Sequence, residues 1–209
     1  MLYSYLKERY GENEPIILSD LKVEGMSESN LRQQIMKLTK DGRVKRYDTG
    51  VYFIPQKSVF RSGSSLSCDR VLEVKYLQNS EGRCGYVSGL MFANLIGLTS
   101  QVSMTYDVVT NKATRDYRET TLAKSRVIVR KPRVPVTETN YRTLQFLDLL
   151  KDIDMISEVS DESLQQRLTR YMKESNISFP KLEVYLPYYP DRIYKNLYET
   201  RLVHGILAQ

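Results

Sequence analysis

Residues 29–40 (SNLRQQIMKLTK) decide the fold at the N-terminal end of this chain. Leu31, Ile35 and Leu38 recur at positions i, i+4 and i+7, which places them on one stripe of an α-helix that faces a core. The opposite face carries polar and basic side chains. The dipeptide DG follows at 41–42, and a glycine after a periodic run is a typical helix stop. The stretch therefore predicts an amphipathic helix with one face open to a partner.

The segments around this helix predict a small folded unit. Residues 2–10 have one apolar helical face, and residues 16–21 (IILSDL) indicate a brief strand or a helical turn. Residues 43–54 (RVKRYDTGVYFI) indicate a β-hairpin with a three-residue turn, Asp-Thr-Gly. Ser27 or Ser29 offers an N-cap for the central helix. Helix, short element, helix and hairpin is the order of a winged helix-turn-helix.

The length of 209 residues suits two domains, and 41% apolar residues are enough for each to build a core. A stretch rich in Ser and Gly follows the hairpin and indicates a linker. We predict a winged helix-turn-helix at 1–57, a linker at 58–66 and a larger mixed α/β domain at 67–209. The expected fold class is therefore α+β.

The pattern of the second part predicts helices and strands in alternation. In chain order these are a helix at 67–78, an apolar helix at 85–96, strands at 104–110 and 125–130, a long helix at 137–153, an amphipathic helix around 164–172 and a last helix after Pro190.

The outer face of the 29–40 helix carries the side chains that read base edges. Asn and Gln can bond adenine in two places, and Arg can do the same with guanine, so Asn30, Arg32 and Gln33 are the expected base readers. Basic residues beside them would hold phosphates and set the register. The predicted DNA-binding residues are Ser29, Asn30, Arg32, Gln33, Lys37, Lys40, Arg43, Lys45 and Arg46.

Charge is unevenly distributed along this part of the chain. Residues 29–47 hold six basic and one acidic side chain, a net of +5, whereas residues 1–28 hold three basic and six acidic, a net of −3. The whole chain has a net charge of +6, which favours nucleic acid first and an acidic protein surface second. Two alternatives stay open: a charged face that is only solvated, and a winged helix that binds protein.

A second basic cluster at 112–133 has eight basic and two acidic side chains, a net of +6. It would extend the DNA footprint, dock an acidic partner, or protect a solvated strand edge with charge. Its members are Lys112, Arg115, Arg118, Lys124, Arg126, Arg130, Lys131 and Arg133.

The sequence gives little support to enzymatic chemistry. His204 is the single histidine, and Cys68 and Cys84 fit neither a disulfide framework nor a zinc site. There is no phosphate-binding glycine loop or nucleophile elbow, so we expect no catalytic residue, metal or cofactor. The remaining enzymatic rival is a magnesium-dependent nuclease using Asp148 and Asp152, against the plainer interpretation of a polar helix surface.

The hydropathy pattern predicts neither a membrane partner nor export. No stretch approaches the roughly 18–20 uninterrupted apolar residues of a membrane span. The N-terminal residues become charged too soon for a signal peptide. We therefore expect a cytoplasmic protein.

Several short blocks of this sequence form a recognisable set: SNLRQ at 29–33, DGR at 41–43, GVYFIP at 50–55, GYVSG at 85–89, GLTSQV at 97–102, VTN at 109–111 and RKPR at 130–133. With these blocks the chain resembles the AbiEi-like antitoxins of bacterial type IV toxin–antitoxin systems, which act in abortive infection and phage defence. The likeness covers residues 1–155.

The resemblance implies a transcriptional autoregulator that binds operator repeats in double-stranded DNA upstream of its own operon. It also implies an antitoxin that counteracts a nucleotidyltransferase-like toxin without requiring a stable complex. A nucleotidyltransferase active site is built on acidic residues, so a basic antitoxin surface suits it electrostatically. Helix-turn-helix proteins read paired half-sites, which favours a homodimer on DNA. A winged-helix repressor whose second domain senses a ligand or oligomerises, with no toxin partner, stays open as the alternative.

Overall fold

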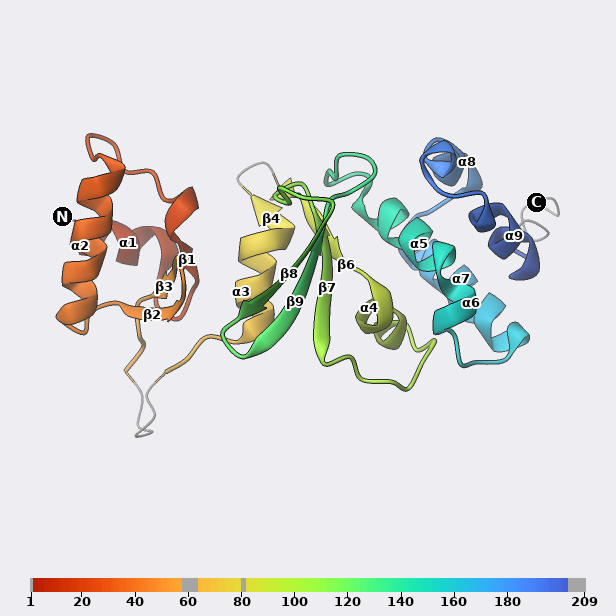
Figure 1. Cartoon of the computed structure of the whole chain (residues 1–209), viewed down its shortest axis with the longest axis horizontal. Helices are drawn as coiled ribbons and strands as arrows, with labels where there is room; N and C mark the ends of the chain where they lie inside the picture. The colour runs from red at the N-terminus through yellow and green to blue at the C-terminus, as the bar shows by residue number, and fades with distance from the viewer. Residues whose placement is uncertain (1, 58–63, 80–81, 203–209) are drawn as a thin grey trace. The chain divides into compact units, whose positions relative to one another are not determined.

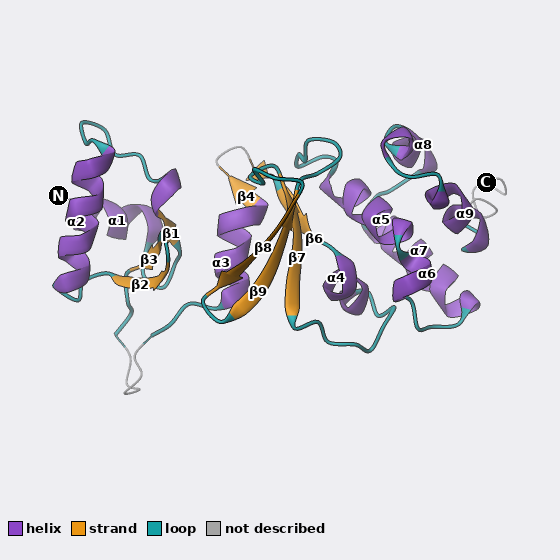
Figure 2. Ribbon diagram, viewed as in Figure 1, coloured by secondary structure: helices purple, strands orange, loops and turns teal. Residues whose placement is uncertain are grey.

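The computed structural model describes residues 2–57, 64–79 and 82–202, and the chain divides into two compact units. The first comprises Met1–Lys75 with Leu122–Lys124, and the second comprises Tyr76–Thr121 with Ser125–Gln209. Figure 1 follows the elements along the chain and Figure 2 colours them by type. Helices and sheets are both present, so the expected α+β class is confirmed. None of the described helices has the length and apolar composition needed to cross a bilayer.

The first unit contains two main helices and a small antiparallel sheet. The strands lie in the order β1-β3-β2, so the N-terminal strand pairs with the second strand of the hairpin. The segment predicted as a strand or a helical turn contains both, a strand and then a 3-10 turn. The elements are α1 (Leu2–Tyr10), β1 (Ile16–Ile17), η1 (Leu18–Asp20), α2 (Glu28–Lys40), β2 (Lys45–Asp48) and β3 (Val51–Phe53).

Helix α2 has the apolar stripe that the sequence predicts. The Ser27 hydroxyl caps it by accepting a 3.3 Å hydrogen bond from the Asn30 backbone N–H, so the helix begins just before the expected residue. Leu31, Ile35 and Leu38 are buried. They join one core whose other buried members are Leu2, Leu6, Ile16, Leu21, Val44 and Ile54.

The hairpin turn differs from the expectation of three residues. Asp48 pairs with Val51, which leaves a two-residue turn at 49–50. The register shifts between Arg46 and Asp48, so the extra residue is taken up inside strand β2 rather than in the turn. Gly50 has φ +72°, a conformation that glycine adopts without steric cost.

The predicted helix at 67–78 is found as α3 (Cys68–Leu72) followed by a π-helical turn, η2 (Glu73–Leu77). The Ser67 hydroxyl caps α3 by accepting a 3.2 Å hydrogen bond from the Arg70 N–H. The Arg70 guanidinium also lies 2.9 Å from the Glu14 carboxylate, and both residues belong to the first unit, as does α3. Of the predicted linker, residues 58–63 lie outside the described part of the chain.

The second unit is built on a four-stranded sheet of order β6-β7-β9-β8, in which β6 is antiparallel and β9 parallel to β7. The two predicted strands are found as β7 and β9, while β8 was not predicted because its residues alternate poorly and are mostly exposed. The strands are β4 (Gln78–Asn79), β5 (Gly82–Arg83), β6 (Gly85–Val87), β7 (Thr105–Thr110), β8 (Tyr117–Leu122) and β9 (Ser125–Arg130).

The prediction of one apolar helix at 85–96 is wrong. Its first residues form strand β6, and only Gly89–Leu95 is helical (α4). Gly85 explains the difference: a Cβ atom there would lie 2.6 Å from the Tyr76 carbonyl oxygen and 2.7 Å from that of Val109. The glycine lets strand β7 and the preceding segment approach this backbone closely, and pairing with β7 overrides helical propensity.

The remaining helices lie on one side of this sheet (Figure 2), with α4 against β7, α5 against β6, and α8 and α9 against α5. Their core includes Phe92, Phe146 and Leu147. The predicted helix at 137–153 is shorter, because Asn140 holds a turn before it by accepting from the Thr137 N–H, and Asp152 ends it. The two later predicted helices are found as α7 and α9, whereas α6, α8 and η3 were not predicted. The helices are α5 (Tyr141–Lys151), α6 (Ile153–Ile156), α7 (Asp161–Glu174), α8 (Phe179–Glu183), η3 (Leu186–Tyr188) and α9 (Arg192–Glu199).

Candidate nucleic-acid interface

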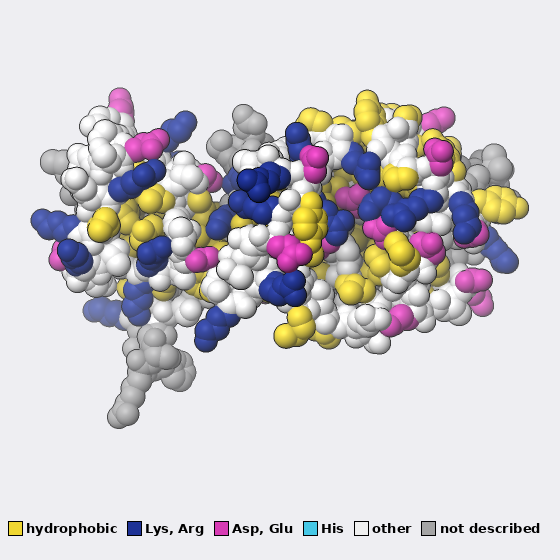
Figure 3. All heavy atoms as spheres, viewed as in Figure 1, with side chains coloured by type: hydrophobic (Ala, Val, Ile, Leu, Met, Phe, Trp, Pro, Cys, Tyr) yellow, Lys and Arg dark blue, Asp and Glu magenta, His cyan; other side chains and the backbone are white. Residues whose placement is uncertain are grey.

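The structure exposes all nine residues predicted to contact DNA. Six lie on α2, one lies in the turn after it, and two begin strand β2. Figure 3 shows lysine and arginine side chains spread over the visible face of this unit. Because the opposite stripe of α2 is buried, the helix can present its polar face without exposing the core.

Four of these residues have free functional groups. Within the described ranges, Gln33, Lys37, Lys40 and Lys45 make no side-chain hydrogen bond or ion pair. An unpaired ammonium or amide on a helix face loses no internal partner when it binds DNA. Binding of DNA by these four side chains would therefore break no hydrogen bond or ion pair of the folded protein.

Three more residues of α2 make only weak local contacts. The Arg32 guanidinium lies 3.6 Å from the Glu28 carboxylate, and both side chains are exposed, so this pair contributes little. The Asn30 side-chain oxygen accepts a 3.2 Å hydrogen bond from Gln34, which leaves its amide N–H groups free. The Ser29 hydroxyl lies 3.2 Å from that of Ser27.

Two arginines are fixed against the unit instead. The Arg43 guanidinium lies over the Tyr3 ring, 3.8 Å from its centroid. Arg46 donates to the Asp48 carbonyl oxygen at 3.3 Å and to the Thr49 hydroxyl at 3.1 Å, so it is held at the hairpin turn. A cation held in place loses less conformational entropy on binding an anion.

The fold also brings Arg32 and Arg46 together. Both line a hollow of about 710 Å³ in the first unit, bounded by β1, η1, the start of α2 and the hairpin turn. Lys22 lies on the same hollow, with apolar residues such as Leu21 and Met26. A concave surface with cations at its border can receive a phosphate backbone.

The second basic cluster is not one continuous group. Lys124 belongs to the first unit, while its other members belong to the second. Arg126 pairs with the Glu119 carboxylate at 3.1 Å. Arg115 and Arg118 are exposed, and Lys112 is half-buried. The three interpretations of this cluster therefore stay open for its exposed members.

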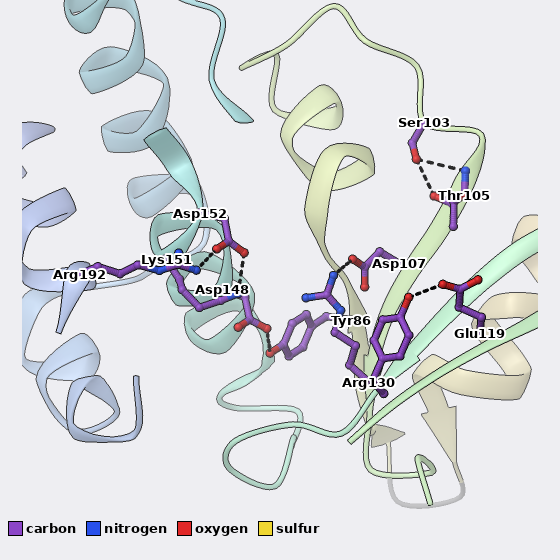
Figure 4. Close-up of polar contacts among 11 residues, drawn as sticks. Tyr86, Ser103, Thr105, Asp107, Glu119, Arg130, Asp148, Lys151, Asp152 and Arg192 are labelled. Carbon is purple, nitrogen blue, oxygen red and sulfur yellow. Dashed lines mark hydrogen bonds and ion pairs between the residues drawn. The ribbon is translucent and has the colours of Figure 1, made fainter. Parts of the chain in front are cut away.

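Two of the last three residues of that cluster are engaged at the end of β9. Arg130 pairs with the buried Asp107 (Figure 4). Arg133 donates to the Tyr188 carbonyl oxygen at 3.2 Å and lies 5.3 Å from the centroid of the Tyr189 ring. Lys131 is exposed.

The structure gives Asp148 and Asp152 separate environments. Asp148 accepts a 2.6 Å hydrogen bond from the Tyr86 hydroxyl, and burial raises the pKa of its carboxyl. Asp152 pairs with Lys151 at 2.6 Å and with Arg192 (Figure 4). No cluster of three or more metal-binding side chains occurs in the described part of the chain.

The remaining candidates for enzymatic chemistry are the two cysteines and the histidine. Cys68 is half-buried and Cys84 is buried, they form no disulfide, and the Cys84 thiol donates to the Tyr76 carbonyl oxygen at 3.7 Å. His204 lies outside the described residues.

Sequence reasoning missed a group of buried polar residues in the second unit, chiefly Tyr86, Asp107 and Lys151. Asp107 interrupts an apolar strand, and Lys151 ends a helix that is apolar on most sides. A charged residue inside an otherwise buried segment is the signal that could have indicated them, because burying a charge is costly unless it is paired.

No family model matches this chain, and no curated protein matches its sequence. The likeness to the AbiEi-like antitoxins therefore stands on the motifs quoted above.

Proposed function

We propose that this protein is a DNA-binding transcriptional regulator whose first unit is a winged helix-turn-helix. One observation carries the proposal: α2 buries its apolar stripe and leaves a polar, basic face that continues along the chain into β2. All nine residues on this surface are exposed. Such a face combines base-reading amides and guanidinium groups with phosphate-binding cations.

The topology of the first unit supports this assignment. A helix, a short strand, a 3-10 turn, a second helix and a hairpin follow in order, and the hairpin pairs with the short strand. In a winged helix-turn-helix, the helix before the hairpin enters the major groove, which is the position of α2. In this arrangement Asn30, Arg32 and Gln33 read bases.

The hairpin residues supply the backbone contacts. Lys45 is exposed and unpaired in the described structure, and Arg46 is held at the turn. Together with Arg43, Lys37 and Lys40, they would neutralise phosphates on either side of the inserted helix.

On the resemblance stated above, we extend the proposal to an antitoxin and autoregulator of a type IV toxin–antitoxin operon. The toxin would be a nucleotidyltransferase-like protein, counteracted without a stable complex. The second unit would supply this antitoxin function, and a homodimer would bind the paired operator repeats.

A gel-shift titration of the full chain tests the DNA-binding proposal. Its own upstream DNA and a scrambled duplex are compared at about 50 and about 200 mM salt. We expect tighter binding to the upstream DNA, weakened strongly by salt. Equal weak binding to both duplexes, or none, would reject a sequence-specific regulator and favour a protein-binding winged helix.

A second candidate is a winged-helix repressor that senses a small ligand and has no toxin partner. The hollow of about 310 Å³ in the second unit favours it. Co-expression with each neighbouring gene separates the two candidates. Growth arrest by a neighbour, relieved by this chain, supports the antitoxin, whereas neighbours that are harmless when expressed alone support the repressor.

A further inference from the structure

The second unit contains a hollow of about 310 Å³ at the end of strand β9. Its charged lining consists of four cationic and two acidic side chains. Arg130 pairs with Asp107 and Lys151 with Asp152, so Lys131 and Arg133 are the lining cations that no carboxylate holds in the described structure. The charged lining residues are Arg130, Lys131, Arg133, Lys151, Asp116 and Asp148.

The strand register builds one wall of the hollow. Tyr86 on β6 is opposite Val109 on β7, and Val109 is opposite Arg130 on β9, so these three residues form a row across one face of the sheet. Helix α5 contributes Asp148 and Lys151, which lie three residues apart on adjacent turns of one face. Backbone pairing thus fixes the position of Arg130 relative to Tyr86, whose hydroxyl contacts Asp148 of this helix.

Arg130 has donor groups that the protein does not satisfy. One guanidinium nitrogen, Nη2, pairs with Asp107, but the buried Nε has no hydrogen-bond partner in the described structure. The second carboxylate oxygen of Asp107 is also buried without a partner there. Unsatisfied buried polar groups are rare in native proteins and indicate a bound water, ion or ligand.

The border of the hollow adds free groups of both signs. Lys131 and Asp116 are exposed, and neither side chain has a partner among the described residues. The Lys131 backbone N–H donates to the Asp116 carbonyl oxygen at 3.2 Å, which holds the two residues side by side. A free ammonium and a free carboxylate can therefore bind different groups of one ligand.

The acidic side chain at the back of the hollow opposes an anion only weakly. Asp148 is buried and accepts the Tyr86 hydroxyl, and burial raises the pKa of its carboxyl. A carboxyl with a raised pKa carries less negative charge at a given pH.

We propose that this hollow binds a small phosphate ester that also carries hydroxyl groups, of the size of a sugar phosphate. Arg130, Lys131 and Arg133 hold the phosphate, because guanidinium and ammonium groups form charge-assisted hydrogen bonds with its oxygens. Asp116 accepts a ligand hydroxyl. The volume falls at the lower end of small-molecule sites, about 300–1,000 Å³.

A single phosphate ester fits this lining better than a DNA strand does. A duplex carries one charge per roughly 1.7 Å, so several phosphates would face Asp116 and Asp148. A ligand with one phosphate directs its hydroxyls at these carboxyls instead. The proposed phosphate-ester site and the proposed DNA-binding surface use different residues. An experiment can therefore reject either proposal without rejecting the other.

Isothermal titration of the full chain with ribose 5-phosphate, inorganic phosphate and a short DNA duplex tests the proposal. We expect ribose 5-phosphate to bind more tightly than inorganic phosphate. Lys131→Met should weaken ribose 5-phosphate about tenfold, equivalent to about 1.4 kcal/mol. Arg118→Met is the matched control, since it removes one exposed charge on β8 outside the hollow, and it should leave the affinity unchanged.

Asp116→Ala tests the hydroxyl contact separately. It should keep inorganic phosphate binding and reduce the advantage of ribose 5-phosphate over it. All three substitutions are at exposed positions, so unchanged thermal unfolding midpoints confirm that the fold is intact. The proposal is wrong if ribose 5-phosphate does not bind, if Lys131→Met and Arg118→Met weaken it equally, or if only the duplex competes for the site.

Discussion

The Tyr86 hydroxyl donates a 2.6 Å hydrogen bond to the Asp148 carboxyl and thereby joins strand β6 to helix α5 (Figure 4). Burial, and then the neighbouring Asp148, raise the pKa of Tyr86 well above its ordinary value, so the phenol keeps its proton and donates. Burial likewise raises the pKa of Asp148. A second polar contact joins the same two elements, because the Gln145 side-chain amide donates a 2.8 Å hydrogen bond to the Val87 carbonyl oxygen.

Tyr86→Phe should lower the free energy of unfolding by about 1–3 kcal/mol, because it leaves a buried carboxyl without its donor. Urea denaturation followed by circular dichroism measures the change. Tyr117→Phe is the control: Tyr117 donates to Glu119 at 2.6 Å, but both residues are exposed, and we expect a change within about 0.5 kcal/mol. Equal losses in the two variants would contradict a special role for the buried pair.

Asp148→Asn should flatten the dependence of stability on pH. The folded pKa of Asp148 is raised above its ordinary value of 3.8, so its favourable contribution is complete below that value and is lost as pH rises through the folded pKa. Asparagine keeps an acceptor for Tyr86 and does not titrate. The difference in unfolding free energy, variant minus parent, should therefore increase from acidic towards neutral pH. Parallel curves in urea titrations over this range would contradict the prediction.

Glu158→Gln should have the opposite pH signature. Hydrogen bonds from the Thr99 hydroxyl, then from Gln101 and the Ser100 backbone N–H, lower the pKa of Glu158 to about 2. Its contribution is present above the ordinary value of 4.5 and is lost as pH falls towards the folded pKa. The variant should be less stable than the parent at neutral pH and equal to it near pH 2.

The matched control for that experiment is Glu162→Gln, an exposed glutamate near the start of α7. It should show no comparable convergence with the parent in acid. Thermal unfolding at several pH values is the measurement. If both variants follow the parent, the Glu158 contacts do not hold the loop at 97–101 in solution.

Arg32→Ala should weaken binding to the operator by about 1–3 kcal/mol and relax the preference at one base position. The Arg32 side chain is 67% exposed and its pair with Glu28 is weak, so stability should change by less than about 0.5 kcal/mol. Gel shifts against a set of operator variants measure both affinity and preference. Met36→Ala, another exposed position of α2, is the control. If Arg32→Ala binds operator and scrambled DNA as the parent does, α2 does not read the sequence through this residue.

The combined change Lys45→Ala and Arg46→Ala should weaken binding to all sequences and flatten the salt dependence. Each lost phosphate contact lowers the slope of log K against log salt by about 0.9. Titrations at several salt concentrations give the slope. Lys57→Ala, an exposed and unpaired lysine of the described first unit, should leave it nearly unchanged. An unchanged slope in the double variant would place the hairpin away from the backbone.

The two parts of the chain differ in how far the sequence predicts them. In the first unit, the stripe of Leu31, Ile35 and Leu38 and the glycines at 42 and 50 act locally, so the helix and the hairpin could be predicted from near neighbours. In the second unit, the 85–96 segment was misassigned because its apolar composition suits a helix as well as a buried strand. Pairing with β7, which is distant in sequence, makes residues 85–87 a strand.

Helical periodicity is a local property, so the α+β class, the amphipathic helix α2 and the identity of its exposed polar residues follow from the amino-acid sequence alone. The tertiary fold brings Tyr86, Asp107, Arg130 and Asp148 together, since they come from three strands and a helix far apart along the chain. It also decided that Arg130 pairs inward rather than joining an exposed basic patch. Burial makes an unpaired charge costly, and this cost depends on neighbours that no local pattern reveals.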